Sequence, residues 1–568
     1  RIYRKREGKH TMKKYLILLL LLIPSLSFAA CPGTPADCYT SCGDKCLTVI
    51  DASQPAVQAA VNAVTSEDEW WTVNVPASAG IEWTAGVTVA NKKLKLVGGS
   101  GGSTTTITAN TTVSLITFNI TTYPIEISNF IFNGTTGNGS VVKIDKYQSS
   151  DTTKVNGVRV YNNQFNINKS STWKGYVYGL VDGNTFSQPY SYFLVTEPMP
   201  ADTAADRNTQ WGDVSWTRGI DFSALAADAV YFENNTSTVP SLSYFVDSAQ
   251  GSRVVVRYNN LTNSILSMHG IGQAGGKVRG SFVNVFHNNK ILYNLAGWSI
   301  ASIKILGGTG LAYNNTSDLS GSGTGTFYSQ VQSYRSNPSF TNATNDAYWN
   351  QVCSATNEYV DGGVDGPADG YPCADNTGTS GDIAAGGQTI TPYYAWNNKQ
   401  KGVAVKLAPI ASDTYTVTHT QNNRDYYDQD DVNCPTKVDG DTACTAGVGV
   451  GTQRPDHCTA GTAYFETDED ALYKCASTDT WAKYFEPYTC PHPLAGAGEC
   501  GEAAGKDGYI LGGEPPIYTA ASSVVNTTGG TVSGSQSVES GSTATFTYEA
   551  FNGWKFKAWA GTCGGSGT

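Results

Sequence analysis

The chain has few charged residues and almost no methionine. Charged residues make up 15% of its 568 residues, Met occurs 3 times, and the net charge is -11. No basic run lies outside the N-terminus, so the electrostatic footprint of a nucleic-acid-binding protein is missing. We therefore expect no nucleic acid among its partners.

Metal-ligand spacing is also missing. No Cys-X-X-Cys pair occurs, and the 6 histidines are scattered along the chain. The acidic stretches at 365–370 and 428–441 invite a calcium interpretation, but neither fits the twelve-position loop with its closing Glu. We expect no metal site and no cofactor, with weak surface binding of calcium left open.

What the chain does contain favours short strands. It has 61 Gly, 32 Tyr and 40% hydrophobic residues, together with many Asn and Thr. This composition supplies a sizeable core and suits strands and turns better than helices. The class predicted is all-β.

The N-terminus has the pattern of an export signal. Two lysines after Met12 precede an apolar run at 15–23 and a Ser-Phe-Ala at 27–29, which predicts a secretory signal peptide cut after Ala29. The run is shorter than the ~20 residues that a spanning helix needs. Cys31 also allows a lipoprotein interpretation, although the residues before it make a poor lipobox. We expect a secreted or cell-surface bacterial protein that is monomeric and does not span a membrane.

Thirteen cysteines in an exported chain indicate disulfides. Four of them crowd residues 31–46, and Cys563 near the end has no neighbour. Pairing by proximity is one choice among many connectivities, and it joins Cys353 with Cys373, Cys434 with Cys444, Cys458 with Cys475, and Cys490 with Cys500.

A recurring asparagine follows the short β-branched and aromatic runs. Its positions are Asn163, Asn184, Asn235, Asn259, Asn289 and Asn315. Spacing of 20 to 30 residues is typical of a solenoid, and the 51-residue interval before Asn235 has room for two coils. We expect these amides to stack at a turn between successive coils.

The asparagines also set the phase of the strands, because alternate residues face opposite sides. Three positions earlier, the inner column is apolar throughout: Val160, Val181, Phe232, Val256, Phe286 and Ala312. One residue further on, the side chains are expected to face solvent: Tyr161, Asp182, Glu233, Arg257, His287 and Tyr313.

Several segments carry a resemblance to a known superfamily. They are an amphipathic stretch at 57–64, the short β runs at 72–78, 81–89 and 93–107, and the recurring runs at 158–165 and 179–186. Over residues 49–424 the chain resembles the pectin-lyase-like superfamily and its secreted bacterial members. The resemblance implies a right-handed parallel β-helix whose open end is capped by the N-terminal helix, and it implies no particular reaction.

Two further units are expected toward the C-terminus. Residues 449–496 look like a small disulfide-closed β-hairpin unit, and the tail from Ser523 resembles the bacterial repeat domain related to internalin B-repeats. The predicted organisation is therefore a leader, a Cys-rich segment, a β-helix, a disulfide-rich cap region and a partial repeat module. The boundaries are 1–29, 30–48, 49–425, 426–515 and 516–568.

Candidate site residues come from the outward column and its turns. Glu233, Arg257 and His287 would lie on successive coils and are the catalytic candidates. The substrate-binding candidates are Arg253, Asp247, His269, Trp211 and Trp216. The alternative is a row of ion pairs on a sheet, worth roughly 0.2 to 1 kcal/mol for each pair.

The sequence is compatible with two functions. The first is a non-catalytic protein that presents a groove and loops to a polysaccharide, a cell-surface glycan or another surface. The second is a polysaccharide lyase, or less readily a glycoside hydrolase, acting on an acidic polysaccharide. A hydrolase needs two carboxylates about 5 to 9.5 Å apart, and Glu233 has only Asp228 and Asp247 as candidate partners.

Overall fold

The computed structural model describes most of the chain between residues 34 and 496. The described ranges are 34–65, 68–99, 103–110, 112–134, 139–146, 153–189, 192–197, 216, 219–270, 280–295, 300–319, 327–331, 376–381, 389–409, 420–428, 444–496, 517–520, 530–532, 536–539 and 548–550. The chain divides into two compact units, residues 1–503 and 504–568. The predicted leader, the 365–370 stretch, most of 428–441 and Trp211 lie outside the described residues.

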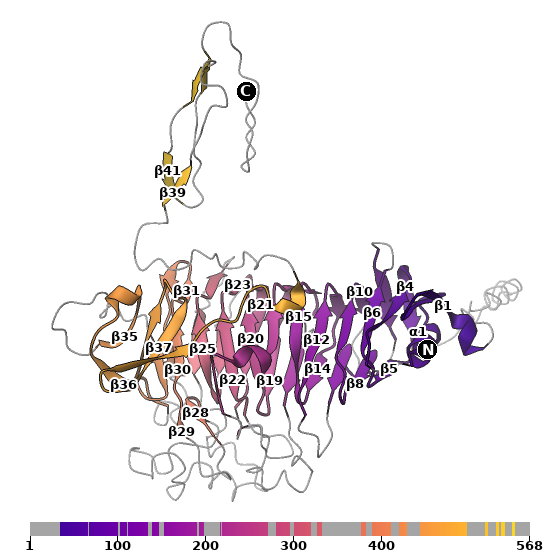
Figure 1. Ribbon diagram of the computed structural model, residues 1–568, viewed down its shortest axis with the longest axis horizontal. Helices are drawn as coiled ribbons and strands as arrows, with labels where there is room; N and C mark the ends of the chain where they lie inside the picture. The colour runs from indigo at the N-terminus through magenta and orange to yellow at the C-terminus, as the bar shows by residue number, and fades with distance from the viewer. Residues whose placement is uncertain are drawn as a thin grey trace, which may run out of the picture. The chain divides into compact units, whose positions relative to one another are not determined.

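Two large sheets make up most of the first unit (Figure 1). Among the described residues, the first sheet has 13 strands that are hydrogen-bonded in chain order. They are β1 (Tyr39–Gly43), β2 (Cys46–Val49), β3 (Trp71–Val75), β6 (Leu94–Gly98), β9 (Ile125–Ser128), β12 (Val155–Tyr161), β15 (Val177–Asp182), β18 (Val230–Glu233), β20 (Arg253–Arg257), β22 (Val283–His287), β25 (Thr309–Tyr313), β30 (Tyr393–Trp396) and β34 (Tyr426–Asp428).

The second sheet contains 19 strands of the described chain. They are β4 (Ser78–Trp83), β5 (Val87–Ala90), β7 (Thr105–Ala109), β8 (Ile116–Asn119), β10 (Phe130–Gly134), β11 (Val142–Asp145), β13 (Gln164–Ile167), β14 (Ser171–Lys174), β16 (Thr185–Phe186), β17 (Phe193–Thr196), β19 (Thr236–Ala249), β21 (Asn260–Met268), β23 (Lys290–Tyr293), β24 (Ile300–Ile305), β26 (Thr316–Leu319), β27 (Phe327–Val331), β31 (Lys399–Gln400), β32 (Val403–Ala404) and β33 (Leu407–Pro409).

The chain alternates between these sheets. A strand of the first sheet, such as β12, leads into one or two strands of the second, β13 and β14, before the chain returns to β15. Equivalent strands of successive repeats pair in parallel, as β12 does with β15 and β13 with β16. The expectation of a mostly β protein with parallel sheets is confirmed.

The α-helix of the described chain lies where the sequence predicts it. Helix α1 (Gln54–Ala63) begins after Ser53, whose side chain accepts a hydrogen bond from the Ala56 N–H, and it has a proline in its first turn. Ala56, Val57, Ala60 and Val61 are buried on one face. The helix contacts β2, β3 and β5, so its apolar face covers the first repeats.

The asparagine ladder is present and longer than expected. Each amide Nδ2 donates to the Oδ1 of the next asparagine at 2.9 to 3.1 Å, and the row continues from Asn315 to Asn398. The residue before each ladder asparagine has a positive φ, as at Asn162 (54°) and Asn288 (55°). Asn tolerates this left-handed conformation, which explains the Asn-Asn pairs.

The 51-residue interval holds one repeat rather than two. Asn184 donates directly to Asn235, and β15 pairs with β18 without a strand between them. The interval is therefore a single repeat with a long insertion. The second coil for which the interval has room is not formed, because interval length alone does not separate an extra strand from a long loop.

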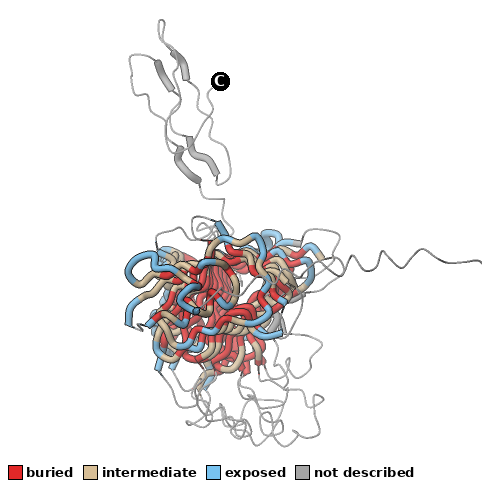
Figure 2. Tube along the Cα trace, turned by 90° about the vertical axis from the view of Figure 1, so that its right-hand side faces the viewer, coloured by how far each residue is buried: buried red, intermediate tan, exposed pale blue. Residues whose placement is uncertain are grey.

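The core lies between the two sheets, as the inner column requires. Val160, Val181, Phe232, Val256, Phe286 and Ala312 are all 0% exposed and stand in register. Rings from the second sheet stack beside them, with Phe165 and Phe186 4.8 Å apart. Figure 2 shows buried residues through the interior and exposed ones at the periphery.

A small four-stranded sheet follows the two large ones. It comprises β35 (Cys444–Gly449), β36 (Cys458–Glu466), β37 (Ala471–Ser477) and β38 (Thr480–Phe485). β36 and β37 form an antiparallel hairpin joined by the Cys458–Cys475 disulfide, as expected. A second disulfide joins Cys42 and Cys46. Cys38 and Cys490 each take part in a further disulfide.

Three short antiparallel pairs complete the described strands. β28 (Thr379–Ser380) pairs with β29 (Thr389–Ile390) in the first unit. In the second unit β39 (Ile517–Ala520) pairs with β41 (Gln536–Glu539), and β40 (Gly530–Val532) with β42 (Tyr548–Ala550). Within the described residues, no helix has the length and apolar character to cross a membrane.

Candidate functional site

The predicted outward column exists as a continuous row on the first sheet. Strand register places the following residues side by side: Tyr161, Asp182, Glu233, Arg257, His287, Tyr313 and Trp396. The three catalytic candidates, Glu233, Arg257 and His287, are thus neighbours on consecutive strands. Sequence phasing predicted this juxtaposition correctly.

The row does not face solvent, which corrects the prediction. Glu233 is 0% exposed, Arg257 1% and His287 2%. The four-stranded sheet and the segment after it, residues 486–496, lie over this face of the first sheet (Figure 1). A column that points away from the core is therefore buried by a second layer formed about 200 residues later in the chain.

Glu233 and Arg257 form a bonded ion pair that holds this layer. Arg257 Nε donates to Glu233 Oε2 at 2.8 Å, and its Nη2 lies 2.7 Å from the same oxygen. The guanidinium also donates to the carbonyl oxygens of Tyr488 and Thr489, the latter at 2.8 Å. The N–H of His492 donates to Glu233 Oε1 at 3.1 Å. Both charged groups thus bond each other and also backbone groups of the segment 486–496.

His287 is enclosed in an aromatic stack. Its ring lies 4.6 Å from that of Tyr313 at 6°, and Tyr313 lies 4.3 Å from Trp396 at 7°. Phe465 of the four-stranded sheet packs on Trp396 at 4.8 Å. Burial, with the nearby Arg257 charge, lowers the pKa of His287 well below its ordinary value. His287 is therefore a neutral packing residue at pH 7.

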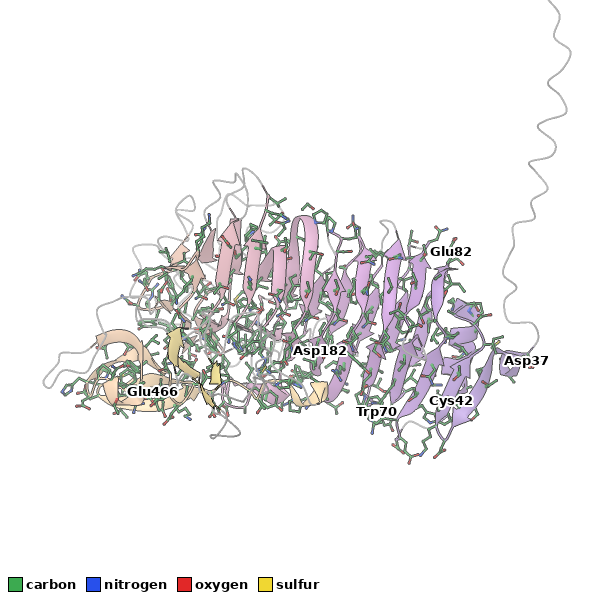
Figure 3. The ribbon with its side chains drawn as sticks, turned by 90° about the horizontal axis from the view of Figure 1, so that it is seen from above. Asp37, Cys42, Trp70, Glu82, Asp182 and Glu466 are labelled. Carbon is green, nitrogen blue, oxygen red and sulfur yellow. A yellow bond between two sulfur atoms is a disulfide. The ribbon has the colours of Figure 1, made fainter. Side chains whose placement is uncertain are left out.

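A second ion pair lies further along the row. Arg159 donates to both carboxylate oxygens of Asp182, at 2.9 and 2.6 Å, and also to the carbonyl oxygen of Ala495 at 3.4 Å. Asp182 and Glu466 of the covering sheet lie toward the same side in Figure 3, whereas Glu82 of β4 lies on the opposite side. Both ion pairs of the row therefore hold the covering layer.

His492 fills the space between the two ion pairs. Its ring lies 4.8 Å from Tyr231 and 5.3 Å from Tyr488. Burial, followed by the charges of Arg257 and Arg159, lowers the pKa of His492 to about 4. A neutral imidazole is thus the stable form beside two guanidinium groups.

A small cavity remains beneath the covering layer. Its volume is about 10 Å³, and its lining includes Tyr231, Arg257, His287, Phe485 and Tyr488. Such a volume has room for about one water molecule. It is too small for a sugar ring.

The other predicted binding residues are also occupied by packing. Arg253 is 3% exposed, and its guanidinium lies 5.0 Å from the ring of Phe282. Trp216 packs on the same ring at 4.7 Å, and its Nε1 donates to the Gly280 carbonyl at 3.1 Å. Trp216 is therefore buried where a sugar-stacking role requires exposure, while Trp211 lies outside the described residues.

Asp247 and His269 belong to the second sheet. His269 Nε2 lies 3.1 Å from Asp247 Oδ1, and both side chains are partly exposed. Glu233 and Asp247 point outward from different sheets with the core between them, so they form no catalytic pair. Asp228, the other carboxylate considered for Glu233, is bound by Lys154 at 2.7 Å. The paired carboxylates of a glycoside hydrolase are not formed by these residues.

The residues that sequence reasoning missed are those of the covering layer, residues 444–496. Tyr484 and Phe485 of β38, and Tyr488 and His492 after it, make ring contacts with the first sheet. Their signal in the sequence is an aromatic stretch interrupted by prolines, which has neither strand alternation nor helical spacing.

Comparison of the chain with family models, with curated proteins and with solved structures gave no match. Within the described part of the chain, no group of three or more His, Cys, Asp or Glu side chains is arranged to hold a metal ion.

Proposed function

We propose that the protein is a non-catalytic secreted or cell-surface protein that binds glycan or another surface. The observation that carries this proposal is the covered row on the first sheet. Glu233 and Arg257, the residues best suited to acid-base chemistry, form hydrogen bonds with each other and with the chain's own backbone. A buried, fully bonded ion pair is a structural device rather than a catalyst poised for substrate.

The scaffold we propose is a right-handed parallel β-helix of the pectin-lyase-like type. The alternation of the chain between two parallel sheets and the asparagine ladder through Asn398 support it. Helix α1 at the first repeats acts as the cap of the open end. A stiff scaffold of this kind suits the presentation of an extended surface to a polymer.

Secretion is supported by the disulfides. Cys42–Cys46 and Cys458–Cys475 are formed, and such bonds persist in oxidising compartments. The second unit, related by resemblance to surface-protein repeats, would then serve as a spacer or attachment module.

A polysaccharide panel tests the proposal. The full chain is incubated with uronate, sulfated and neutral polymers, with and without calcium, and both binding and product formation are measured. We expect binding to at least one polymer without unsaturated products or new reducing ends. Unsaturated products or new reducing ends formed by the wild type would show the protein to be an enzyme, and their loss in a Glu233→Gln variant that remains folded would place the reaction at Glu233.

A further inference from the structure

The outer face of the second sheet carries a cluster of polar side chains, on the other sheet from the Glu233–Arg257 row. Register places Asp247 of β19 beside Ser267 of β21, and Ser267 beside Lys304 of β24. Val246, Leu266 and Ile303, one position earlier on each strand, point into the core. Alternation along a strand therefore directs Asp247, Ser267 and Lys304 outward.

Ser267 has an unmet hydrogen-bonding capacity. Its side-chain oxygen is buried and has no hydrogen-bond partner in the described part of the chain. A buried hydroxyl without a partner destabilises the folded state, because its lost hydration is not compensated. Asp247 and Lys304 flank it on the two neighbouring strands, and adjacent strands of a sheet are spaced about 4.8 Å apart.

The surroundings of the Lys304 amine favour the binding of an anionic group. No carboxylate within the described residues forms an ion pair with it, and its Nζ lies 5.8 Å from the ring of Tyr244. Burial lowers the pKa of Lys304, and the Asp247 carboxylate offsets only part of this effect. A bound anionic group would restore the favourable surroundings of the charged amine.

The side chains beside Lys304 can contact the ring and the hydroxyl groups of a sugar. The Tyr244 ring packs against that of Tyr192 at 6.3 Å, and aromatic faces favour contact with the apolar faces of sugar rings. Asp247 Oδ1 lies 3.1 Å from His269 Nε2 and has no hydrogen-bond partner in the described part of the chain, so it can accept a hydrogen bond from a sugar hydroxyl.

We propose that Tyr244, Asp247, Ser267, His269 and Lys304 form the binding site for an anionic glycan, with Lys304 holding its carboxylate or sulfate group. This inference rests on the proposed function and gives it a location and a ligand class. The site lies on the second sheet, away from the Glu233–Arg257 row.

The test compares four full-chain variants with wild type by calorimetric titration. The probes are polygalacturonate for a carboxylate, dextran sulfate for a sulfate and dextran as a neutral polymer. Lys304→Gln is expected to weaken the preferred anionic probe about tenfold, as the loss of a charge-assisted hydrogen bond does. Lys304→Arg should retain most of the affinity. Lys290→Gln removes an exposed charge from the same sheet and should leave the affinity unchanged.

Ser267→Ala separates binding from folding. Loss of a hydroxyl that has no partner should leave the melting temperature unchanged or raise it, while a hydroxyl that meets the glycan should cost affinity when removed. We expect at least threefold weaker binding with no loss of thermal stability. Unchanged affinity in both Ser267→Ala and Lys304→Gln would overturn the site.

The remaining outcomes are also decisive. Equal weakening by Lys304→Gln and Lys290→Gln would indicate unspecific attraction and overturn the site, and equal binding of dextran would overturn the anionic class. In each of these cases the wild type still binds glycan, so the proposed function stands. Absence of binding by the wild type to every polymer would remove glycan binding from the proposed function together with the site.

Discussion

Arg257 donates to Glu233 across two neighbouring strands, and the carbonyl of Tyr488, 231 residues further along, accepts a hydrogen bond from the same guanidinium. The pair therefore connects two repeats of the large sheet to a segment formed much later in the chain. Because both charges are removed from water, each depends on the other and on this segment for compensation.

Removal of one member of this pair should be costly. Arg257→Met leaves the Glu233 carboxylate buried without its guanidinium, and we expect a loss of about 3 to 5 kcal/mol in the free energy of unfolding. The double variant with Glu233→Gln should lose less than the sum of the two single changes. Urea denaturation of the three variants measures this coupling.

A matched control is the partly exposed pair of Lys95 and Glu126, 3.0 Å apart on the same sheet. Lys95→Met should change stability by no more than about 1 kcal/mol. Equal losses for Lys95→Met and Arg257→Met would contradict the role assigned to burial.

The asparagine ladder should tolerate substitution poorly. Asn259 donates to two backbone carbonyls and to Asn289, and it accepts from Asn235. Asn259→Ala leaves several of these buried groups unsatisfied, so we expect a loss of about 2 to 4 kcal/mol. Asn156→Ala at an exposed position of β12 is the control, and thermal unfolding followed by circular dichroism compares the two.

Acid should loosen the covering segment. The pKa of His492 is about 4 in the folded chain against 6.5 for the free side chain, so the unfolded state binds the extra proton between these values. Stability is therefore full above about pH 6.5 and falls as the pH approaches 4, by up to about 3 kcal/mol. The lowered pKa of His287 acts in the same direction.

The measurement is the melting temperature as a function of pH for wild type and His492→Asn. Asparagine cannot be protonated, but it can accept the hydrogen bond that the Leu494 N–H donates to the imidazole Nδ1. We expect the variant to be less stable at pH 7.5 and to lose less stability on acidification. Parallel pH profiles would show that other groups dominate the acid response.

The Cys458–Cys475 disulfide should stabilise the covering layer in particular. It closes a loop with a sequence separation of 17, for which chain-entropy estimates give about 3 kcal/mol. With both cysteines replaced by serine, limited proteolysis should cleave residues 444–496 before it cleaves the two large sheets. Replacement of Cys42 and Cys46, which enclose a separation of only 4, should not produce this order of cleavage.

Much of the scaffold could be predicted because its signals are local. The asparagine positions, the inner apolar column and the capping pattern before α1 each depend on neighbouring residues and on strand alternation. The 51-residue interval could not be resolved, because a long insertion leaves the same interval as an additional repeat.

The candidate site could be predicted only in part. Strand phase placed Glu233, Arg257 and His287 side by side, since register is a property of the repeats themselves. Their exposure was predicted wrongly, since it depends on residues 444–496, which return over the sheet from far along the chain. The grouping of Asp247, Ser267 and Lys304 was also missed, because three separate strands supply it.

The sequence by itself determined the strand content, the ladder and the inward or outward direction of each strand residue, because these follow from local backbone geometry and alternating polarity. Only the tertiary structure decided which outward residues meet water. An outward row can be solvated or covered, and the choice depends on long-range packing, here on whether the chain supplies a second layer with backbone groups that match the charges beneath it.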